Sequence, residues 1–292
     1  MADFIQLLVA GLTTGGIYAL TAVGFTLLWQ TSQTINFAQG EFVMLPAFFV
    51  LIAMGFFGMP FWFAVVIALL ATMLTLGAMF KKLMVDPMIN HGVLPLVIAT
   101  IGLAIFMKEA VREFYGADAW PFPPLAAAIN ITVFGAGLAV QSLVVLGISI
   151  GAVVALQLFL SHTRIGRCMQ ATAQNPSVAR LLGIPVERMI LYTFLINAAL
   201  VMLASLLITP IYLAKFTNGE LLGLYAFIAA IIGGFNQMKG AIVGGLLLGV
   251  IDNFTAAYIS TQYRLVVPLF FLIVIILFRP QGLLGRVEER TV

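Results

Sequence analysis

Polar side chains interrupt long apolar stretches of the sequence at two places, one in each half of the chain. The residues at these breaks are Asn36, Gln39 and Glu41 in the first, and Asn236, Gln237 and Lys239 in the second. Both breaks offer amide groups and free backbone beside glycine. Paired interruptions of this kind indicate a polar path through an apolar layer, although two surface loops in water would have the same composition.

Ionisable side chains in or beside apolar stretches are functional candidates by default, and here they are Glu41, Glu220, Lys239 and Asp252. Glu41 also suits the first turn of a helix, where the helix dipole favours an acid. Asp252 and its neighbour Asn253 stand well inside an apolar stretch, which burial against another helix or a place near the outer rim would explain. We count Asn253 among the candidate path residues. A further group is predicted to be interfacial, with side chains that snorkel to water: Lys108, Glu109, Arg112 and Glu113.

The sequence carries no recognisable catalytic set. It has two histidines, His91 and His162, and one cysteine, Cys168, so it can form no disulfide within the chain. The H-E-x-x-H and G-x-S-x-G patterns are absent. The phosphate-binding pattern G-x-x-x-x-G-K-[ST] is absent as well, so any ATP hydrolysis must come from another subunit. We therefore predict that the chain is not an enzyme and has no cofactor.

Composition places the chain in a membrane. Of its 292 residues, 62% are hydrophobic and 9% are charged, whereas soluble domains carry about 25% charged residues. The apolar runs are continuous, which favours helices of roughly 20 residues over the alternating strands of a barrel. We predict a single all-α transmembrane domain over 1–292 with about eight or nine helices. The apolar segments are 4–29, 41–58, 60–80, 93–115, 138–160, 189–213, 221–236, 240–259 and 265–279.

Basic residues indicate which side of the membrane each loop occupies. Nine of them share one face if 93–115 and 138–160 cross the membrane as a pair: Lys81, Lys82, Arg164, Arg167, Arg180, Arg188, Arg279, Arg286 and Arg290. The positive-inside rule then makes that face, with the C-terminus, cytoplasmic. The net charge of +3 thus reflects orientation in a lipid bilayer, with no role in nucleic-acid binding. The opposite face holds the proline-rich loop 116–137, and the side of the N-terminus stays open.

Small residues four apart predict close helix packing at four places. The pairs are Gly11/Gly15, Gly147/Gly151, Gly240/Gly244 and Gly245/Gly249.

The segment 161–188 is the one sizeable polar stretch on the cytoplasmic face. Asn175 followed by Pro176 indicates a turn and a helix start, and Gly183 indicates a helix stop. An apolar stripe lies between them. The segment is therefore predicted to form two short helices at a bend, a rigid projection that can push on a soluble partner. An amphipathic helix lying on the lipid surface is the alternative.

Several motifs together resemble those of one transporter family. They are the opening Gly11-Leu-Thr-Thr-Gly-Gly-Ile-Tyr-Ala-Leu20 with Gly24 and Ile35-Asn-Phe-Ala-Gln-Gly-Glu41, the segment from Arg164-Ile-Gly-Arg167 to Leu182-Gly-Ile184, and the end with Gly233-Gly-Phe-Asn-Gln-Met-Lys-Gly-Ala241 and Arg279-Pro-Gln-Gly-Leu283. Over essentially the whole chain, this combination is similar to the inner-membrane permeases of branched-chain amino-acid ABC importers. The chain resembles the first of their two paralogous permeases.

The resemblance implies a type II ABC importer fold in a bacterial inner membrane. It also implies a paralogous second permease, two cytoplasmic ATPase subunits and a periplasmic substrate-binding protein as partners. Related permeases serve amides, urea and aromatic acids as well as branched-chain amino acids. The implied path residues are Asn36, Gln39, Glu41, Asn236, Gln237 and Asn253. The residues implied to couple to the ATPases are Arg167, Gln174, Asn175, Pro176, Ala179, Arg180, Leu182 and Gly183.

Two other functions are compatible with parts of the sequence. A secondary transporter or channel that works alone would need a titratable group in its path, such as Glu41 or Asp252. An intramembrane enzyme acting on lipid would need the catalytic constellation that the sequence lacks.

Overall fold

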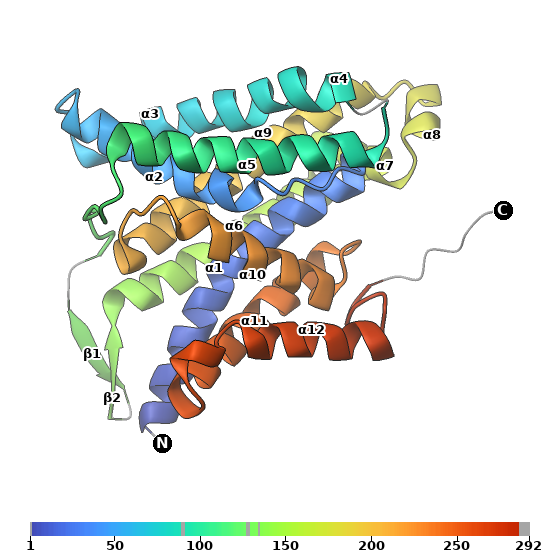
Figure 1. Ribbon diagram of the computed structural model, residues 1–292. Helices are drawn as coiled ribbons and strands as arrows, with labels where there is room; N and C mark the ends of the chain where they lie inside the picture. Colours follow the sequence, from blue (N-terminus) through green and yellow to red (C-terminus); the bar gives the residue numbers. More distant parts are fainter. Residues whose placement is uncertain (1, 89–90, 127–128, 134, 286–292) are drawn as a thin grey trace. The chain divides into compact units, whose positions relative to one another are not determined.

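The computed structural model describes residues 2–88, 91–126, 129–133 and 135–285 (Figure 1). Arg286 and Arg290, which the sequence places in a basic cytoplasmic tail, lie outside these residues. The helices are α1 (Ala2–Ser32), α2 (Gln39–Gly55), α3 (Phe61–Thr72), α4 (Asp86–Met88), α5 (Val93–Tyr115), α6 (Val140–His162), α7 (Arg164–Gln174), α8 (Pro176–Leu181), α9 (Val186–Tyr212), α10 (Asn218–Gly233), α11 (Met238–Tyr258) and α12 (Val266–Phe278). Helix α3 continues through π-helical turns, Met73–Met79 and Lys81–Val85, into α4.

The predicted polytopic helical architecture is confirmed. Within the described residues, 7 helices are long and apolar enough to cross a membrane. They correspond to seven of the nine predicted segments. The other two, 41–58 and 221–236, form the shorter apolar helices α2 and α10. Helix α2 begins directly after the first break and α10 ends directly before the second, so each of the two halves of the chain contains one shortened helix beside a break.

Two local expectations were wrong. The loop 116–137 contains a strand, β1 (Asn130–Val133), which pairs antiparallel with β2 (Ala136–Ala139). Strands of four residues give too short an alternation to be recognised in a sequence. Lys81, which falls in the short loop expected between the predicted segments 60–80 and 93–115, belongs instead to the π-helical continuation of α3 and is 7% exposed.

The described residues form two compact units. The terminal unit comprises the described parts of Met1–Thr26, Pro124–Ile150 and Leu224–Val292, and the central unit comprises Leu27–Pro123 and Gly151–Gly223. Helices α1, α6 and α10 contribute residues to both units.

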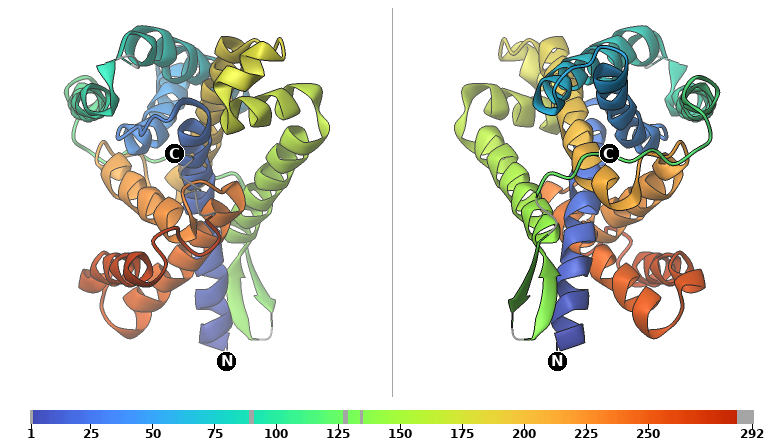
Figure 2. Two further views of the ribbon diagram at one scale, coloured as in Figure 1. Left: turned by 90° about the vertical axis from the view of Figure 1, so that its right-hand side faces the viewer. Right: turned by 90° about the vertical axis from the view of Figure 1, so that its left-hand side faces the viewer.

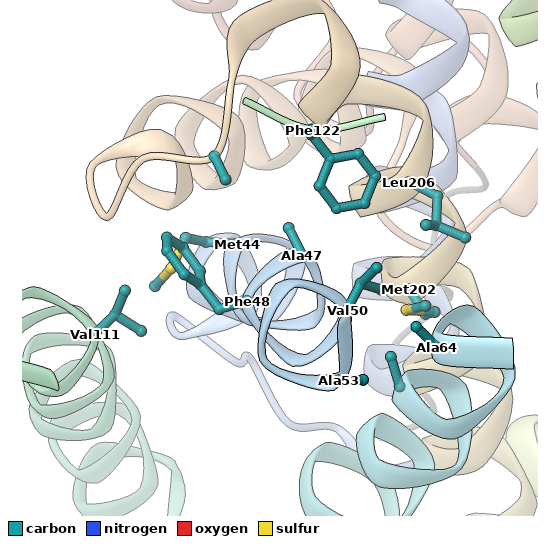
Figure 3. Close-up of a cluster of buried hydrophobic side chains, with 12 residues drawn as sticks. Met44, Ala47, Phe48, Val50, Ala53, Ala64, Val111, Phe122, Met202 and Leu206 are labelled. Carbon is teal, nitrogen blue, oxygen red and sulfur yellow. The ribbon is translucent and has the colours of Figure 1, made fainter. Parts of the chain in front are cut away.

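The apolar core of the central unit lies between α2, α3, α5 and α9. Phe48 and Met44 of α2 face Val111 of α5, while Val50 faces Met202 of α9 (Figure 3). Phe122, from the segment after α5, closes one side of this cluster. Burial of large side chains at this density holds α2 in place although it is short for a membrane-crossing helix.

Close contacts between glycines join the helices of the terminal unit. A Cβ added at Gly11 or Gly15 of α1 would overlap the backbone of α11 at Leu246 or Val250. Gly240 and Gly244 of α11 likewise meet the end of α10. Three of the four predicted glycine pairs thus allow close packing, as expected for helices without a hydrophobic driving force in lipid. Gly147 and Gly151 have nothing within 4 Å, so the fourth prediction was wrong for these described residues.

Candidate functional site

The first polar break is buried, and its amides bond to one another. Residues 33–38 leave the helical conformation between α1 and α2. The side chain of Gln39 is 0% exposed, its Nε2 donates to Asn197 Oδ1 at 2.7 Å, and Asn197 Nδ2 donates back to Gln39 Oε1 at 3.1 Å. Asn36 Nδ2 also donates to Gln39 Oε1, at 3.4 Å. The break is therefore an unwound segment inside the protein, the arrangement that membrane proteins tolerate.

The same segment also uses side chains to satisfy its free backbone. Asn36 Oδ1 accepts from the N–H of Ala38 at 3.0 Å, and Thr100 Oγ1 of α5 accepts from the N–H of Phe37 at 3.3 Å. Thr100 lies roughly 10 Å along α5, a helix of about 33 Å at 1.5 Å per residue. The break therefore lies at an inner depth of this helix and not at either end.

Glu41 lies at the start of α2 against the start of α10. Glu41 is 4% exposed, and a Cβ added at Gly219 would overlap the Glu41 carboxylate. Gly40 meets Gly219 and Gly223 through backbone contacts that a side chain would block. Both helices thus present their N-terminal turns to this carboxylate, which the helix dipoles favour.

The Glu41 carboxylate is incompletely paired. Its Oε2 is buried and has no hydrogen-bond partner among the described residues. Lys108 of α5 and Glu220 of α10 act electrostatically on Glu41, but the Lys108 ammonium bonds to Glu220. Lys108, predicted to be interfacial, thus also forms an ion pair between α5 and α10 that the sequence did not reveal. Glu109 and Arg112 pair with each other on the exposed face of α5, at 2.9 Å.

The second polar break belongs to the terminal unit. Helix α10 ends at Gly233, and α11 begins at Met238. Asn236 and Gln237 are both partly buried there. The segment after α12 returns to this break, where the N–H groups of Leu283 and Leu284 bond the carbonyls of Ile232 and Gly233 at 2.8 and 2.9 Å. The family-like sequence at the C-terminal end thus satisfies the last carbonyls of α10.

Asp252 is the most fully paired acid of the terminal unit, and the sequence did not reveal its partners. It is 0% exposed. Arg264 holds it through two bonds, from Nε at 2.9 Å and from Nη2 at 2.5 Å. The hydroxyls of Tyr18 and Tyr225 bond it at 3.3 and 3.4 Å, and the two rings stack at 5.0 Å. Of the two explanations that the sequence allowed, burial against other helices is the correct one.

Asn253, the next residue, makes structural contacts. Its Nδ2 donates to Gly249 O at 2.9 Å and to Thr14 Oγ1 of α1 at 3.3 Å. The side chain therefore crosses the contact between α1 and α11 that the glycines create.

Helices α7 and α8 form a stiff elbow, which we define as residues 163–184. Thr163 caps α7 by accepting from the N–H of Gly166 at 2.9 Å. Asn175 caps α8 by accepting from the N–H groups of Ser177 and Val178 at 3.0 and 3.1 Å. Figure 2 shows α7 and α8, in yellow, beside the start of α9. Both predicted helices and the bend between them are confirmed.

Gly183 ends α8 in the predicted way. Its φ of 78° is left-handed, its N–H bonds the carbonyl of Arg180 at 3.0 Å, and the N–H of Ile184 bonds the carbonyl of Ala179 at 3.0 Å. This pair of bonds is a Schellman motif, which needs glycine at that position. The elbow is therefore capped at both ends of both helices.

An apolar tip projects from the elbow. Leu181 is 87% exposed and Leu182 is 73% exposed, whereas Ala179 is buried. Arg180 bonds Glu187 of α9 at 3.0 Å, and Glu187 also faces the buried Lys81 at 3.8 Å. The other predicted coupling residues are exposed: Arg167, Gln174, Asn175, Pro176, Arg180 and Gly183.

Comparison with known proteins shows which family the sequence matches. The model of the family described as "Branched-chain amino acid transport system / permease component" matches residues 7–277. The high-affinity branched-chain amino acid transport system permease protein LivH of Salmonella typhimurium is 32% identical, over 99% of this chain and 98% of that protein. The corresponding protein BraD of Pseudomonas aeruginosa is 33% identical over the same shares of the two chains.

The fold is also similar to a solved structure, PsaBC from Streptococcus pneumoniae in complex with Fab. That match covers 96% of each chain, with a TM-score of 0.51 and 15% identity.

The family match over residues 7–277 and the near full-length relatives define a polytopic, mainly helical permease of the ABC importer class. The chain belongs to the family of permease components of branched-chain amino acid transport systems. It is accordingly a multi-pass inner-membrane protein of a transporter family and not of an enzyme family. Membership implies that it works with ATPase and substrate-binding components.

Proposed function

We propose that this chain is one of two paralogous permeases of an ATP-driven importer for branched-chain amino acids or related small amphiphiles. The observation that carries the proposal is the elbow, which is capped throughout and ends in exposed leucines. Two cytoplasmic ATPase subunits would dock on the elbows of the two permeases, and a periplasmic binding protein would deliver the solute. The names of the similar permeases support the substrate class.

Stiffness is what the coupling role requires, because a flexible loop would absorb the movement of the ATPase. The caps at Thr163 and Asn175 and the glycine stop at Gly183 supply that stiffness. Buried Ala179 fixes α8 on the protein, while Leu182 and its neighbour face outward as a contact for a soluble partner. Exposed apolar groups of this kind mark protein interaction sites. We therefore place 161–188 and the C-terminus on the cytoplasmic side.

The polar breaks would frame the translocation path of a single permease domain, 1–292. We assign Asn36, Gln39, Glu41, Asn236, Gln237 and Asn253 to this path. Asn36 hydrogen-bonds the backbone N–H of Ala38 and the side chain of Gln39, and Gln39 bonds Asn197. A passing solute would therefore have to replace hydrogen bonds within the protein. Amides exchange such bonds without creating a deep binding well, and a low affinity favours release.

The coupling role is tested with the assembled transporter in proteoliposomes, with binding protein and solute outside and ATP at the ATPases. Leu182→Ser and Gly183→Pro should each abolish uptake while the chain still inserts and assembles with its partner permease. Leu94→Ser at the start of α5, an exposed leucine outside the elbow, is the matched control and should leave uptake unchanged.

Cysteine crosslinking locates the partner directly, since Cys168 is the one native cysteine. In a Cys168→Ser background, Leu182→Cys should crosslink to an ATPase subunit and not to lipid. Full ATP-driven uptake by both elbow variants, or crosslinks to lipid alone during uptake, would refute the coupling role. Solute movement driven by a proton gradient through the isolated chain would favour the secondary-transporter alternative.

A further inference from the structure

The first turn of α2 and the first turn of α10 enclose one carboxylate that has no counter-charge of its own. Glu41 is 4% exposed, and its Oε2 has no partner within the described residues. Buried charges in native proteins are paired, because an uncompensated charge in an apolar environment is costly. An orphaned carboxylate oxygen at this depth therefore marks a place where something else binds.

The charges around Glu41 show what is missing. Two carboxylates, those of Glu41 and Glu220, lie within electrostatic range of one ammonium, that of Lys108. Lys108 donates to Glu220, which leaves Glu41 as the surplus negative charge. A ligand that completes this cluster must bring one positive charge and N–H donors for a carboxylate oxygen. A primary ammonium group has both.

The position agrees with that chemistry. Helix α5 is about 33 Å long. Lys108 lies roughly 22 Å along it, and Thr100, which contacts the first break, lies roughly 10 Å along it. Glu41 therefore lies at an inner depth, between shortened helices from the two halves of the sequence. Discontinuous helices in corresponding halves are where transporters place their solutes. The N-terminal turn of α10 lies against this carboxylate at the start of α2, and helix dipoles favour a negative charge at that place.

We infer that the Glu41 carboxylate, unpaired on one oxygen between the N-terminal turns of α2 and α10, receives the primary ammonium group of the transported solute. The inference rests on the proposed function and specifies its substrate class: solutes with a free ammonium pass, and deaminated analogues do not use this site. The glycine contacts that enclose Glu41 hold the site shut in this conformation, and the ligand enters when α2 and α10 move apart. Gly40, Gly219 and Gly223 permit both the closure and that movement.

Saturation-transfer NMR tests the inference, since it detects weak binding. The sample is the assembled permease–ATPase complex without binding protein, nucleotide-free and with a non-hydrolysable ATP analogue. The probes are L-leucine, L-leucinamide and 4-methylpentanoate, which share an apolar side chain but differ in ammonium and carboxylate. Leucine and leucinamide should bind at least about tenfold more weakly to Glu41→Gln than to the native chain, the loss expected for a charge-assisted hydrogen bond. 4-Methylpentanoate should be unaffected.

Glu109→Gln, which removes an exposed acid of α5, is the matched control and should bind all probes as the native complex does. Glu41→Asp keeps the charge and should keep the preference for ammonium, so it guards against a variant that merely misfolds. Equal binding of leucine to the Glu41→Gln and native complexes in both nucleotide states, or no preference for ammonium in the native complex, would overturn the inference. Native uptake of leucine driven by ATP decides the proposed function separately, because it does not depend on which residue holds the ammonium.

Discussion

Two buried acids of this chain differ in almost every respect except burial. Asp252 of the terminal unit accepts two bonds from Arg264 and one each from Tyr18 and Tyr225. Glu41 of the central unit has one oxygen with no partner among the described residues, and the ammonium within electrostatic range is bonded to another acid. Both carboxylate oxygens of Asp252 therefore accept hydrogen bonds, whereas Glu41 keeps one oxygen that a ligand can still bond.

The difference separates structure from function in a membrane protein. An acid whose charge is matched by a two-pronged guanidinium holds helices together, and it has no capacity left for a passing solute or proton. This weakens Asp252 as the proton carrier that a secondary transporter would need. An acid left unmatched gains nothing for the fold, so its presence calls for a ligand.

The largest predicted effect is loss of the Asp252 cluster. Asp252→Asn leaves the Arg264 guanidinium without its counter-charge and should destabilise the protein by about 3 kcal/mol. Thermal unfolding of the purified permease, followed by the loss of its monodisperse size-exclusion peak, measures this.

A second variant sharpens this result. Replacing both partners, Asp252→Leu with Arg264→Leu, should recover most of the stability because no charge is left unpaired. Equal stability of the Asp252→Asn and native proteins would show that the cluster does not hold the fold.

The next effect concerns the contact between α2 and α10. Gly219→Ala would drive a methyl group into the Glu41 carboxylate and should cost about 1–3 kcal/mol together with most of the uptake. Gly102→Ala on α5 is the control, because nothing lies within 4 Å of that position. If the two alanine variants take up solute equally well, α2 and α10 do not form the tight contact described here.

A smaller effect is expected from the buried amide pair. Gln39→Leu leaves the amide of Asn197 unsatisfied and should cost about 1–2 kcal/mol, as should Asn197→Leu. The double replacement should be less harmful than the sum of the two, since no polar group is then orphaned. Additive losses in a double-mutant cycle on unfolding would argue against the pairing.

The smallest effect belongs to the helix cap of the elbow. Asn175→Ala removes an acceptor for two backbone N–H groups and should cost about 1 kcal/mol. Faster hydrogen exchange confined to 176–181 would show it, whereas Asn175→Ser should retain most of the protection. Unchanged exchange in the alanine variant would mean that the cap does not stiffen α8.

Much of the architecture was predictable because apolar runs of helical length have few alternatives in a membrane. Nine segments were predicted, and each corresponds to a helix, including the two short ones. The elbow was equally predictable, since Asn175, Pro176 and Gly183 act through their own backbone and the turns beside them. Helix caps and stops of this kind depend only on residues close together in the sequence.

The pairing of side chains was not predictable to the same degree. Gln39 and Asn197 are far apart in the sequence, as are Tyr18 and Asp252, and no local pattern links either pair. The bond between Lys108 and Glu220 likewise depends on how α5 and α10 pack. Polar residues in apolar segments drew attention to these positions, but only the packing of the helices decides which acid is paired and which keeps an oxygen without a partner.

The comparison of the two acids is tested most directly by ATP-driven leucine uptake per assembled complex, measured in parallel for Glu41→Gln and Asp252→Asn. We predict that the Glu41 variant assembles in native amounts and transports poorly, while the Asp252 variant assembles poorly and the surviving complexes transport at the native rate. Native uptake per complex in the Glu41 variant, or a transport defect in fully assembled Asp252 variant, would contradict the account.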